Sequence, residues 1–274
     1  MDDINPRFRG TYQLLGPQHF ARVSSASVCV VGLGGVGSWS VEALARSGVG
    51  SLTLVDLDEV CVTNINRQIH ALTDTVGRSK AQLLADRVKA INPDCQVRVE
   101  RRFFTDSSAD EILSSGFDVV LDTIDRNENK TTLIGECVNR SLRVITVGAG
   151  GDRLDASKAT VADLARTIHD PLLQIVRKQL RQWYDFPKGE RARFNVPCVY
   201  APKQRGPRDT ESPSLCATNG EGRKSCNDGL GSAVYVTGVL GFIAAGEVIK
   251  MLGSTVCGCM YPWRKKVFCR VTDT

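Results

Sequence analysis

The sequence predicts an α/β fold in which a mainly parallel, doubly wound sheet carries helices on both faces. Three observations support this prediction. Short segments rich in Val, Ile and Leu alternate with longer helical segments up to about residue 150. A glycine-rich turn follows the first of these segments, and an acidic residue ends the second. After residue 150 the alternation stops, which predicts an irregular basic insert.

Each element of the first half can be assigned from its pattern. The expected strands are short and apolar, and they lie at 27–32, 51–56, 96–100, 118–122 and 143–148. The helical segments between them lie near 38–47, 78–91, 107–115 and 128–140. Because a helix separates each strand from the next, the connections are right-handed crossovers and the strands are expected to be parallel.

The second half is expected to be less regular. A helix is predicted from Asp163 to Tyr184 with an interruption near Pro171, and a segment rich in Pro, Gly, Lys and Arg follows, where hairpins and loops are expected. The uncharged residues 230–246 fall short of the roughly 20 that a membrane span needs, so a buried helix over 230–252 and no membrane insertion are expected. A last strand is expected at 267–271. We therefore expect one domain over 1–274, with a nucleotide-binding half at about 1–150, an insert at about 151–226 and a return to the core at 227–274.

The composition sets limits on the class of protein. Hydrophobic residues make up 42% of the chain and charged residues 24%, which excludes disordered and fibrous classes. The net charge of +5 permits an anionic partner without indicating a dedicated nucleic-acid-binding domain. The first residues are acidic and polar, unlike a secretory signal, and the 10 cysteines are scattered through apolar segments. Both features favour a reducing, cytoplasmic compartment.

The glycine-rich turn has the spacing of a nucleotide-binding site. Gly32, Gly34, Gly35 and Gly37 lie between a predicted strand and a predicted helix, where a tight turn brings backbone N–H groups close to phosphate. Asp56 ends the next strand, where a ribose-binding carboxylate belongs. This pattern predicts a Rossmann-like nucleotide site but leaves open whether the ligand is NAD or ATP.

The polar residues beyond Asp56 favour ATP. A nicotinamide site needs an apolar slot, whereas this stretch supplies amides and cations that suit phosphate and a divalent cation. Asp122 and Asp125 then follow the fourth predicted strand. The remaining residues of the cluster are Asp58, Asn64, Asn66, Arg67, Gln68 and Lys80.

These motifs resemble the adenylation domain of the ubiquitin-activating-enzyme superfamily, which includes the thiamine-pathway and molybdopterin-pathway adenylyltransferases. The resemblance covers nearly the whole chain, including GEVIKML at 246–252. It implies that a carboxylate attacks the α-phosphate of ATP. It also implies that Asp56 holds the ribose, that Arg67 and Lys80 contact phosphates, and that Asp125 organises Mg²⁺.

Longer stretches resemble one branch of that superfamily, the tRNA threonylcarbamoyladenosine dehydratases. They lie at 61–72, 147–181 and 225–242. The resemblance implies ATP-dependent adenylation of the threonyl carboxylate of the modified adenosine, followed by cyclisation. It also implies tRNA as a partner, and basic residues of the insert are candidates for its phosphates. The candidates are Arg166, Arg177, Lys178 and Arg181.

The sequence leaves several alternatives open. An adenylyltransferase for a sulfur-carrier or ubiquitin-like protein is the main one, and a noncatalytic nucleotide-binding partner or an NAD oxidoreductase are others. The chain has no CxxC pair, and Cys257-Gly-Cys259 is a weak metal signal, so no structural zinc is expected. Dehydration needs no thiolate, so structural or regulatory roles are expected for Cys198, Cys216 and Cys226.

Assembly is the last open question. Superfamily members often start with an RYxRQ-like segment whose second Arg reaches the ATP of the partner subunit. Here the chain reads Arg7-Phe8-Arg9-Gly10, so Gly10 occupies that position and either arginine is a candidate. A homodimer is expected. A sulfur-relay partner and a monovalent cation near the site are left open.

Overall fold

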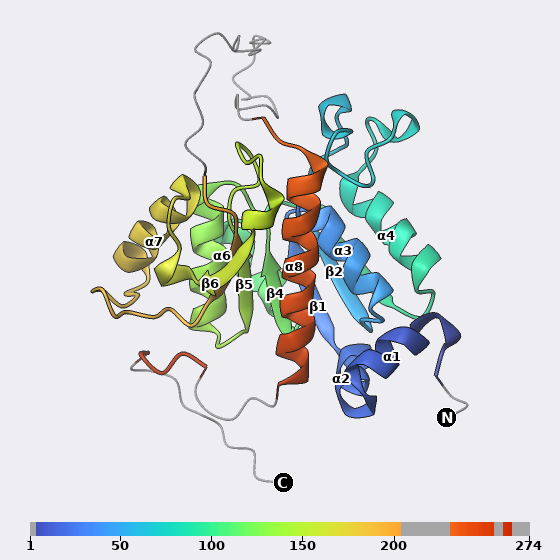
Figure 1. The fold of residues 1–274 in the computed structure, drawn as a ribbon, viewed down its shortest axis with the longest axis horizontal. Coiled ribbons are helices and arrows are strands. Elements are labelled where there is room, and N and C mark those ends of the chain that lie inside the picture. The colour runs from blue at the N-terminus through green and yellow to red at the C-terminus, as the bar shows by residue number, and fades with distance from the viewer. Residues whose placement is uncertain (1–3, 204–230, 255–259, 265–274) are drawn as a thin grey trace.

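A computed structural model describes residues 4–203, 231–254 and 260–264. Within them, one 7-stranded sheet has the strand order β3-β2-β1-β4-β5-β7-β6 (Figure 1). Neighbouring strands pair in parallel except β6, which is antiparallel to β7. The strands are β1 (Ser27–Val31), β2 (Ser51–Val55), β3 (Gln96–Glu100), β4 (Val119–Asp122), β5 (Val144–Val147), β6 (Thr160–Asp163) and β7 (Pro197–Tyr200).

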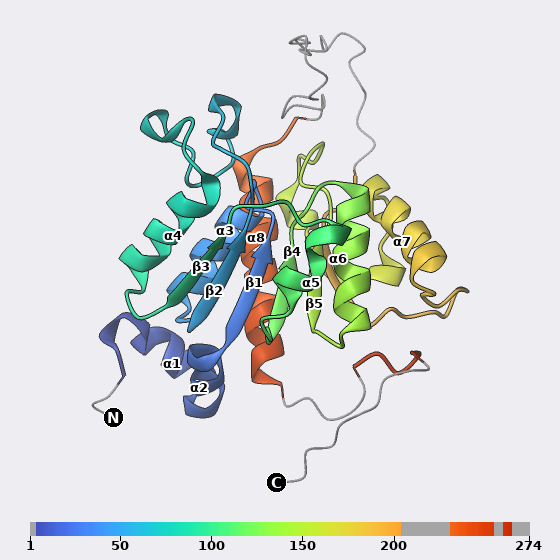
Figure 2. The same cartoon turned by 180° about the vertical axis from the view of Figure 1, so that it is seen from behind.

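Helices cover both faces of this sheet. Figure 1 shows α8 crossing the face that also carries α3 and α4, and Figure 2 shows α5 and α6 on the other face. The predicted doubly wound α/β class is therefore confirmed. The helices are α1 (Arg9–Leu15), α2 (Pro17–Ser25), α3 (Gly37–Arg46), α4 (Lys80–Ile91), α5 (Asp106–Leu113), α6 (Asn127–Asn139), α7 (Pro171–Trp183) and α8 (Val234–Gly253).

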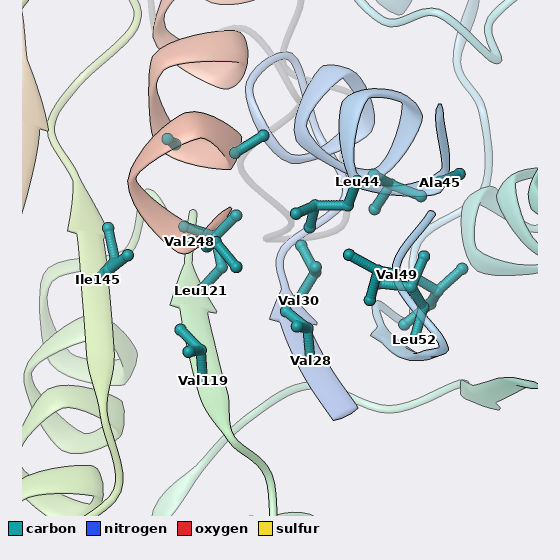
Figure 3. Close-up of a cluster of buried hydrophobic side chains, with 14 of the residues drawn as sticks. Val28, Val30, Leu44, Ala45, Val49, Leu52, Val119, Leu121, Ile145 and Val248 are labelled. Carbon is teal, nitrogen blue, oxygen red and sulfur yellow. The ribbon is translucent and has the colours of Figure 1, made fainter. Parts of the chain in front are cut away.

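The sheet separates two apolar cores because successive strand side chains point to opposite faces. In β1, Val28 and Val30 pack toward α3 and α8, whereas Cys29 and Val31 pack toward α5 and α6. Figure 3 shows Val28 and Val30 in the first core beside Val248 of α8. Burial of each such side chain contributes about 1.5–3 kcal/mol, so β1 is held from both sides.

Helix α8 is long and apolar enough to cross a membrane by length and composition, with a mean hydropathy of 1.5. Yet 56% of that window is buried inside the protein, as in a core helix. Ser40 of α3 donates a hydrogen bond to the carbonyl of Gly241 in α8 at 3.0 Å, and a Cβ at Gly241 would lie 2.7 Å from the Val36 carbonyl oxygen. The two helices approach closely because glycine occupies that position, as expected for a buried helix.

The segment after residue 150 is more regular than expected. Residues 160–163 and 197–200 form β6 and β7 and extend the sheet. The helix expected from Asp163 with an interruption near Pro171 is present in part, as a 3₁₀ helix at Leu164–Arg166 and then α7. The Asp163 carboxylate caps the 3₁₀ helix by accepting the Ala165 N–H at 2.9 Å, and it also accepts the Asn195 N–H at 2.8 Å. Helix α7 starts at Pro171, where Asp170 accepts the Leu173 N–H at 3.1 Å. The rest of the expected insert, residues 204–226, and the expected strand at 267–271 lie outside the described residues.

Candidate functional site

The glycine turn connects β1 to α3 at the carboxyl ends of the parallel strands. Gly32 has φ +88°, a left-handed conformation that favours glycine. A Cβ at Gly37 would lie 2.0 Å from the Gly32 carbonyl oxygen, so the turn closes on itself too tightly for any side chain there. Helix α3 begins at Gly37, and the positive end of its dipole can attract an anion. The N–H groups of Ser38 and Ser40 already bond to the carbonyls of Gly34 and Val36 at 3.1 Å.

Asp56 follows β2 and is tied to this turn. Its Oδ2 accepts the N–H of Leu33 at 2.7 Å and its Oδ1 accepts the N–H of Asp58 at 2.8 Å. Burial raises the pKa of the Asp56 carboxyl, and the nearby Lys80 ammonium and these N–H groups oppose that rise. Each carboxylate oxygen has a second lone pair that can accept a ribose hydroxyl.

Lys80 lies at the first position of α4 and is 4% exposed. Its Nζ lies 3.0 Å from Oδ2 of Asp58. Lys80 and Asp58, which were each predicted to lie in the ATP site, thus form an ion pair in which Asp58 fixes the direction of the Lys80 ammonium. The backbone supports the same arrangement, because the Lys80 N–H bonds to the Asp58 carbonyl at 3.1 Å.

The loop after β2 brings Arg67 and Gln68 against the glycine turn. A Cβ at Gly35 would meet Cγ of Arg67 at 3.3 Å, and a Cβ at Gly34 would meet Nε2 of Gln68 at 3.8 Å. Trp39 of α3 donates its indole N–H to the Arg67 carbonyl at 3.0 Å. These contacts bring the aliphatic part of Arg67 and the amide of Gln68 against the glycine turn. Nη1 of Arg67 donates to the Thr63 carbonyl at 2.8 Å and to Oδ1 of Asn66 at 3.1 Å.

Two asparagines of this loop hold the backbone. The buried Asn64 accepts the Cys61 N–H through Oδ1 at 3.1 Å. Asn66 donates through Nδ2 to the Ser232 carbonyl at 2.7 Å, which links this loop to the segment before α8. Neither contact prevents ligand binding, but both assign these side chains a structural task that the sequence did not indicate.

The structure separates Asp122 from Asp125. Asp122 is fully buried and forms an ion pair with Lys130 at 2.9 Å. Asp125 is exposed, and it forms no ion pair with another residue that the structure describes. Asp125 is therefore the member of the pair that can bind a metal or a ligand.

The loop after β5 forms another wall of the site. A Cβ at Gly150 would meet Cγ2 of Thr237 in α8 at 3.1 Å, and the same methyl lies 3.3 Å from the position of a Cβ at Gly35. Thr237 therefore packs between this loop and the glycine turn. The loop is anchored by the buried ion pair of Arg153 and Asp170, 3.1 Å apart.

Some buried polar atoms of α3 and of the loop after β2 have no partner among the described residues. They are Oγ of Ser38, Oε1 of Gln68 and both ring nitrogens of His70. Burial, and next the Lys80 ammonium, lower the pKa of His70 from 6.5 to about 4, which keeps its imidazole neutral. Buried polar atoms in proteins are usually paired, so the atoms beside the glycine turn are suited to a bound ligand.

The basic residues predicted to contact tRNA do not lie with these groups. Asp163 pairs with Pro197, the first residue of β7, so Arg166 lies toward the amino ends of the parallel strands, opposite the glycine turn. Arg181 lies near the same end, with its guanidinium 5.2 Å from the centre of the Phe194 ring. Arg166 and Arg181 line an open depression of about 600 Å³ there, together with Lys188 and Glu190.

The other two candidates for tRNA contacts lie on α7. Arg177 is half-buried and donates a hydrogen bond to the Thr167 hydroxyl, and burial lowers its pKa. Lys178 is exposed. Lys178 is thus free to meet a partner at the surface, whereas Arg177 also serves the packing of α7.

The remaining residues selected from the sequence are the cysteines and the amino-terminal arginines. Cys198 lies in β7 with 0% exposure, and burial raises the pKa of its thiol, as expected of a structural residue. Cys216, Cys226, Cys257 and Cys259 lie outside the described residues. The segment with Arg7, Arg9 and Gly10 lies at the amino ends of the strands, because Phe8 contacts Gly48, which precedes β2.

The parallel sheet, the glycine turn and the polar groups at the carboxyl ends of its strands define a nucleotide-binding protein of the doubly wound α/β class. The chain belongs to the ThiF family, whose model matches residues 9–266. The superfamily resemblance seen in the motifs is thereby confirmed.

Similar proteins match this chain along most of its length. It is 41% identical over 253 residues to the tRNA threonylcarbamoyladenosine dehydratase of Haemophilus influenzae, covering 92% of this chain and 95% of that protein. The crystal structure of the Escherichia coli tRNA N6-threonylcarbamoyladenosine dehydratase in complex with ATP is similar with a TM-score of 0.79 at 38% identity, covering 92% and 96%. That enzyme has also been solved with AMP, with the same TM-score of 0.79. The sulfur carrier protein ThiS adenylyltransferase of Escherichia coli matches over 130 residues at 32% identity, covering 47% of this chain and 51% of that protein.

Sequence reasoning missed the residues that hold the site in place. The residues that contact the loops of the site are Thr123, Lys130, Arg153, Asp170 and Thr237. A capping Asp before Pro171 is a signal that could have identified the start of α7. The burial of Lys130 and Arg153 has no signal in a single sequence, because lysine and arginine are mostly exposed.

Proposed function

We propose that this chain is an ATP-dependent tRNA threonylcarbamoyladenosine dehydratase that works as a single adenylation domain over residues 1–274. The observation that carries the proposal is its match along 92% of its length to a dehydratase whose structure contains ATP. The same match extends to the complex of that enzyme with AMP, the nucleotide that an acyl-adenylate releases.

The reaction occurs in two steps. A threonyl carboxylate oxygen of the modified adenosine attacks the α-phosphorus of ATP, and pyrophosphate leaves. The neighbouring carbamoyl group then closes onto the activated carbonyl carbon, and AMP leaves, so the nucleoside loses one water overall. Both reacting groups belong to one side chain, so proximity supplies much of the rate without an external nucleophile.

The roles of the protein groups follow from their positions. The glycine turn and the start of α3 bind phosphate through backbone N–H groups, and Asp56 binds the ribose. Arg67 and Lys80 neutralise the charge that develops on the α-phosphate. Asp58 directs Lys80, and the buried amide of Gln68 uses its unpaired oxygen toward the ligand. Asn64 and Asn66 keep the loop in shape.

Asp125 is the residue that we propose to hold Mg²⁺. No group of three or more His, Cys, Asp or Glu side chains suited to a metal occurs among the described residues. An exposed carboxylate beside a phosphate site fits this ion, because Mg²⁺ is commonly held by one or two carboxylates together with substrate phosphates and water. When bound, the ion would stabilise negative charge on the phosphates of ATP.

The partners are proposals as well. The tRNA backbone would meet the exposed Lys178 and the basic residues Arg166, Arg177 and Arg181, which lie outside the adenylation site. We also propose a cytoplasmic homodimer in which Arg7 or Arg9 serves the site of the second subunit. A monovalent cation and a sulfur-relay partner remain predictions.

Mass spectrometry of tRNA nucleosides tests the proposed function directly. The protein is incubated with Mg²⁺, ATP and tRNA that carries threonylcarbamoyladenosine, and the expected result is an ATP-dependent loss of one water from that nucleoside. An unchanged nucleoside in verified substrate would contradict the proposal. Carrier-dependent exchange of pyrophosphate into ATP would instead favour a sulfur-carrier adenylyltransferase, which the shorter match to the ThiS enzyme represents.

A further inference from the structure

An ion pair with no exposure to solvent lies directly behind the site. Asp122 ends β4 and Lys130 lies in the first turn of α6, and both residues are 0% exposed. Nζ of Lys130 lies 2.9 Å from Oδ2 of Asp122. The hydroxyl of Thr146, from the neighbouring strand β5, donates to the same carboxylate oxygen at 2.6 Å.

The pair holds both backbone polar groups of one loop residue. Oδ1 of Asp122 accepts the N–H of Ile124 at 3.0 Å, and Nζ of Lys130 donates to the carbonyl of Ile124 at 3.0 Å. The peptide that links Ile124 to Asp125 is therefore fixed by a charged donor. Asp125, the next residue, is the exposed carboxylate of the site.

A second set of contacts ties the same loop to the glycine turn. The Thr123 N–H bonds to the Val31 carbonyl at 3.0 Å, and the Thr123 hydroxyl bonds to the Gly32 carbonyl. A Cβ at Gly32 would lie 3.0 Å from the Thr123 carbonyl carbon and 3.2 Å from the Ile124 nitrogen. Residues 123–124 thus lie against the phosphate-binding turn, and any movement of Ile124 would move Asp125 relative to it.

Stability alone does not explain these buried charges. Removing an ammonium and a carboxylate from water is costly, and an apolar pair of similar size often stabilises a protein as well or better. Buried charges that fix one conformation are best explained where that conformation matters. Here the conformation that they fix is that of the loop carrying Asp125.

We propose that Asp122 and Lys130 are positioning residues, which hold Asp125 at the distance from the glycine turn that adenylation requires. The catalytic consequence rests on the proposed function, since it assigns Asp125 to the ATP reaction. The conformational consequence, that the pair restrains the loop at residues 122–127, does not rest on the proposed function, because it concerns the free protein. The two consequences can therefore be measured separately.

The test uses Lys130→Met, which keeps the length of the side chain but cannot donate a hydrogen bond to Ile124. Hydrogen exchange is measured in the free full-length protein over a peptide covering residues 122–127, and exchange at least about tenfold faster is expected because the restraint is lost. In the tRNA assay, kcat is expected to fall by about 100-fold, as for a displaced catalytic group, with the KM for ATP within about threefold of wild type.

A matched control distinguishes positioning from a general loss of stability. Glu42 and Arg87 form another ion pair with a buried carboxylate, which joins α3 to α4 away from the loop. Glu42→Gln combined with Arg87→Met is expected to lower the unfolding temperature without changing kcat or exchange at 122–127. If Lys130→Met does not fold, then Asp122→Asn and Thr146→Val give the same measurements with smaller expected effects.

Exchange at 122–127 that stays at the wild-type rate in Lys130→Met would overturn the proposal. A loss of kcat in the control as large as in Lys130→Met would overturn it too. If the wild-type protein itself leaves the nucleoside unchanged, the proposed function fails, and the exchange measurement still decides whether the pair holds the loop.

Discussion

Nζ of Lys80 lies 3.0 Å from Oδ2 of Asp58, and the lysine is buried whereas the Asp58 side chain is 43% exposed. The ammonium is therefore held in one direction by a carboxylate that solvent or a ligand can still reach. Such an arrangement presents a fixed positive charge to an incoming polyphosphate, with little reorganisation when the reaction occurs.

Lys80→Ala is expected to lower kcat for ATP-dependent dehydration by about 100- to 1,000-fold, the usual loss for one electrostatic donor. Asp58→Asn is expected to cause a smaller loss, because Lys80 stays but loses its direction. Steady-state kinetics of both variants measure this, with Lys89→Ala on the exposed side of α4 as the control. Equal rates for Lys80→Ala and wild type would remove Lys80 from the mechanism.

Arg67→Ala is expected to raise the KM for ATP and lower kcat together, because Arg67 lies over the glycine turn. Arg67→Lys is expected to restore only part of the loss, since lysine cannot present two parallel donors to phosphate. Titration of each variant with ATP, followed by single-turnover measurements, separates binding from chemistry. Full activity in Arg67→Lys would show that a point charge is sufficient.

Asp125→Asn is expected to abolish most ATP-dependent activity and to change how the rate depends on Mg²⁺ concentration. An amide carries no charge, so it binds a hard divalent cation more weakly than a carboxylate does. The rate is measured across a magnesium titration at fixed ATP. An unchanged magnesium dependence would contradict the assignment of Asp125, and wild-type rates in the Lys80, Arg67 and Asp125 variants together would disprove the whole site.

Gly37→Ala is expected to destabilise the protein and remove ATP binding, because its Cβ would lie 2.0 Å from the Gly32 carbonyl oxygen. Gly246→Ala is the matched control, since nothing lies within 4 Å of the added Cβ in α8. The control is expected to stabilise the helix by up to about 1 kcal/mol. Thermal unfolding with and without ATP measures both effects, and a stable Gly37→Ala protein that binds ATP would contradict the tight turn.

His70 is expected to make the folded state sensitive to acid. The unfolded chain takes up a proton near pH 6.5, whereas the buried imidazole resists protonation until about pH 4. The free energy of unfolding therefore falls as the pH drops through this window, by about 3 kcal/mol at most for this group. His70→Gln is expected to flatten that dependence in urea unfolding between pH 7 and 4, while His19→Gln keeps it. The same slope in wild type and His70→Gln would rule out His70 as the source.

The sequence was sufficient for the regular half of the fold because strands such as β1 are short apolar segments bounded by turn residues. The predicted ranges for β1 to β5 agree with the structure to within one residue at each end. The prediction failed at β6, whose residues Thr160–Asp163 are partly exposed and form a strand only because β7 lies beside them. Such pairing depends on tertiary contacts that local patterns do not contain.

The candidate site shows the same limit. The glycines and Asp56 could be identified because they follow predicted strands at the spacing of a nucleotide-binding turn, and Lys80 because the surrounding motif resembles that of a known superfamily. Residues that hold the loops of the site in place, such as Lys130 and Arg153, could not be identified from the sequence. Their partners lie in other elements, and no sequence spacing links them. A sequence therefore reveals candidate ligand-binding groups more readily than the residues that position them.

The place of α8 in the chain has a consequence for biosynthesis. This helix covers the centre of the sheet, and its Thr237 packs against the glycine turn, although about 200 residues separate Thr237 from that turn in the sequence. The turn leaves the ribosome early, but its surroundings are complete only when residues 234–253 have followed it. During translation, therefore, the nascent chain is expected to expose the apolar face of its sheet and to lack a finished nucleotide pocket until this late helix docks.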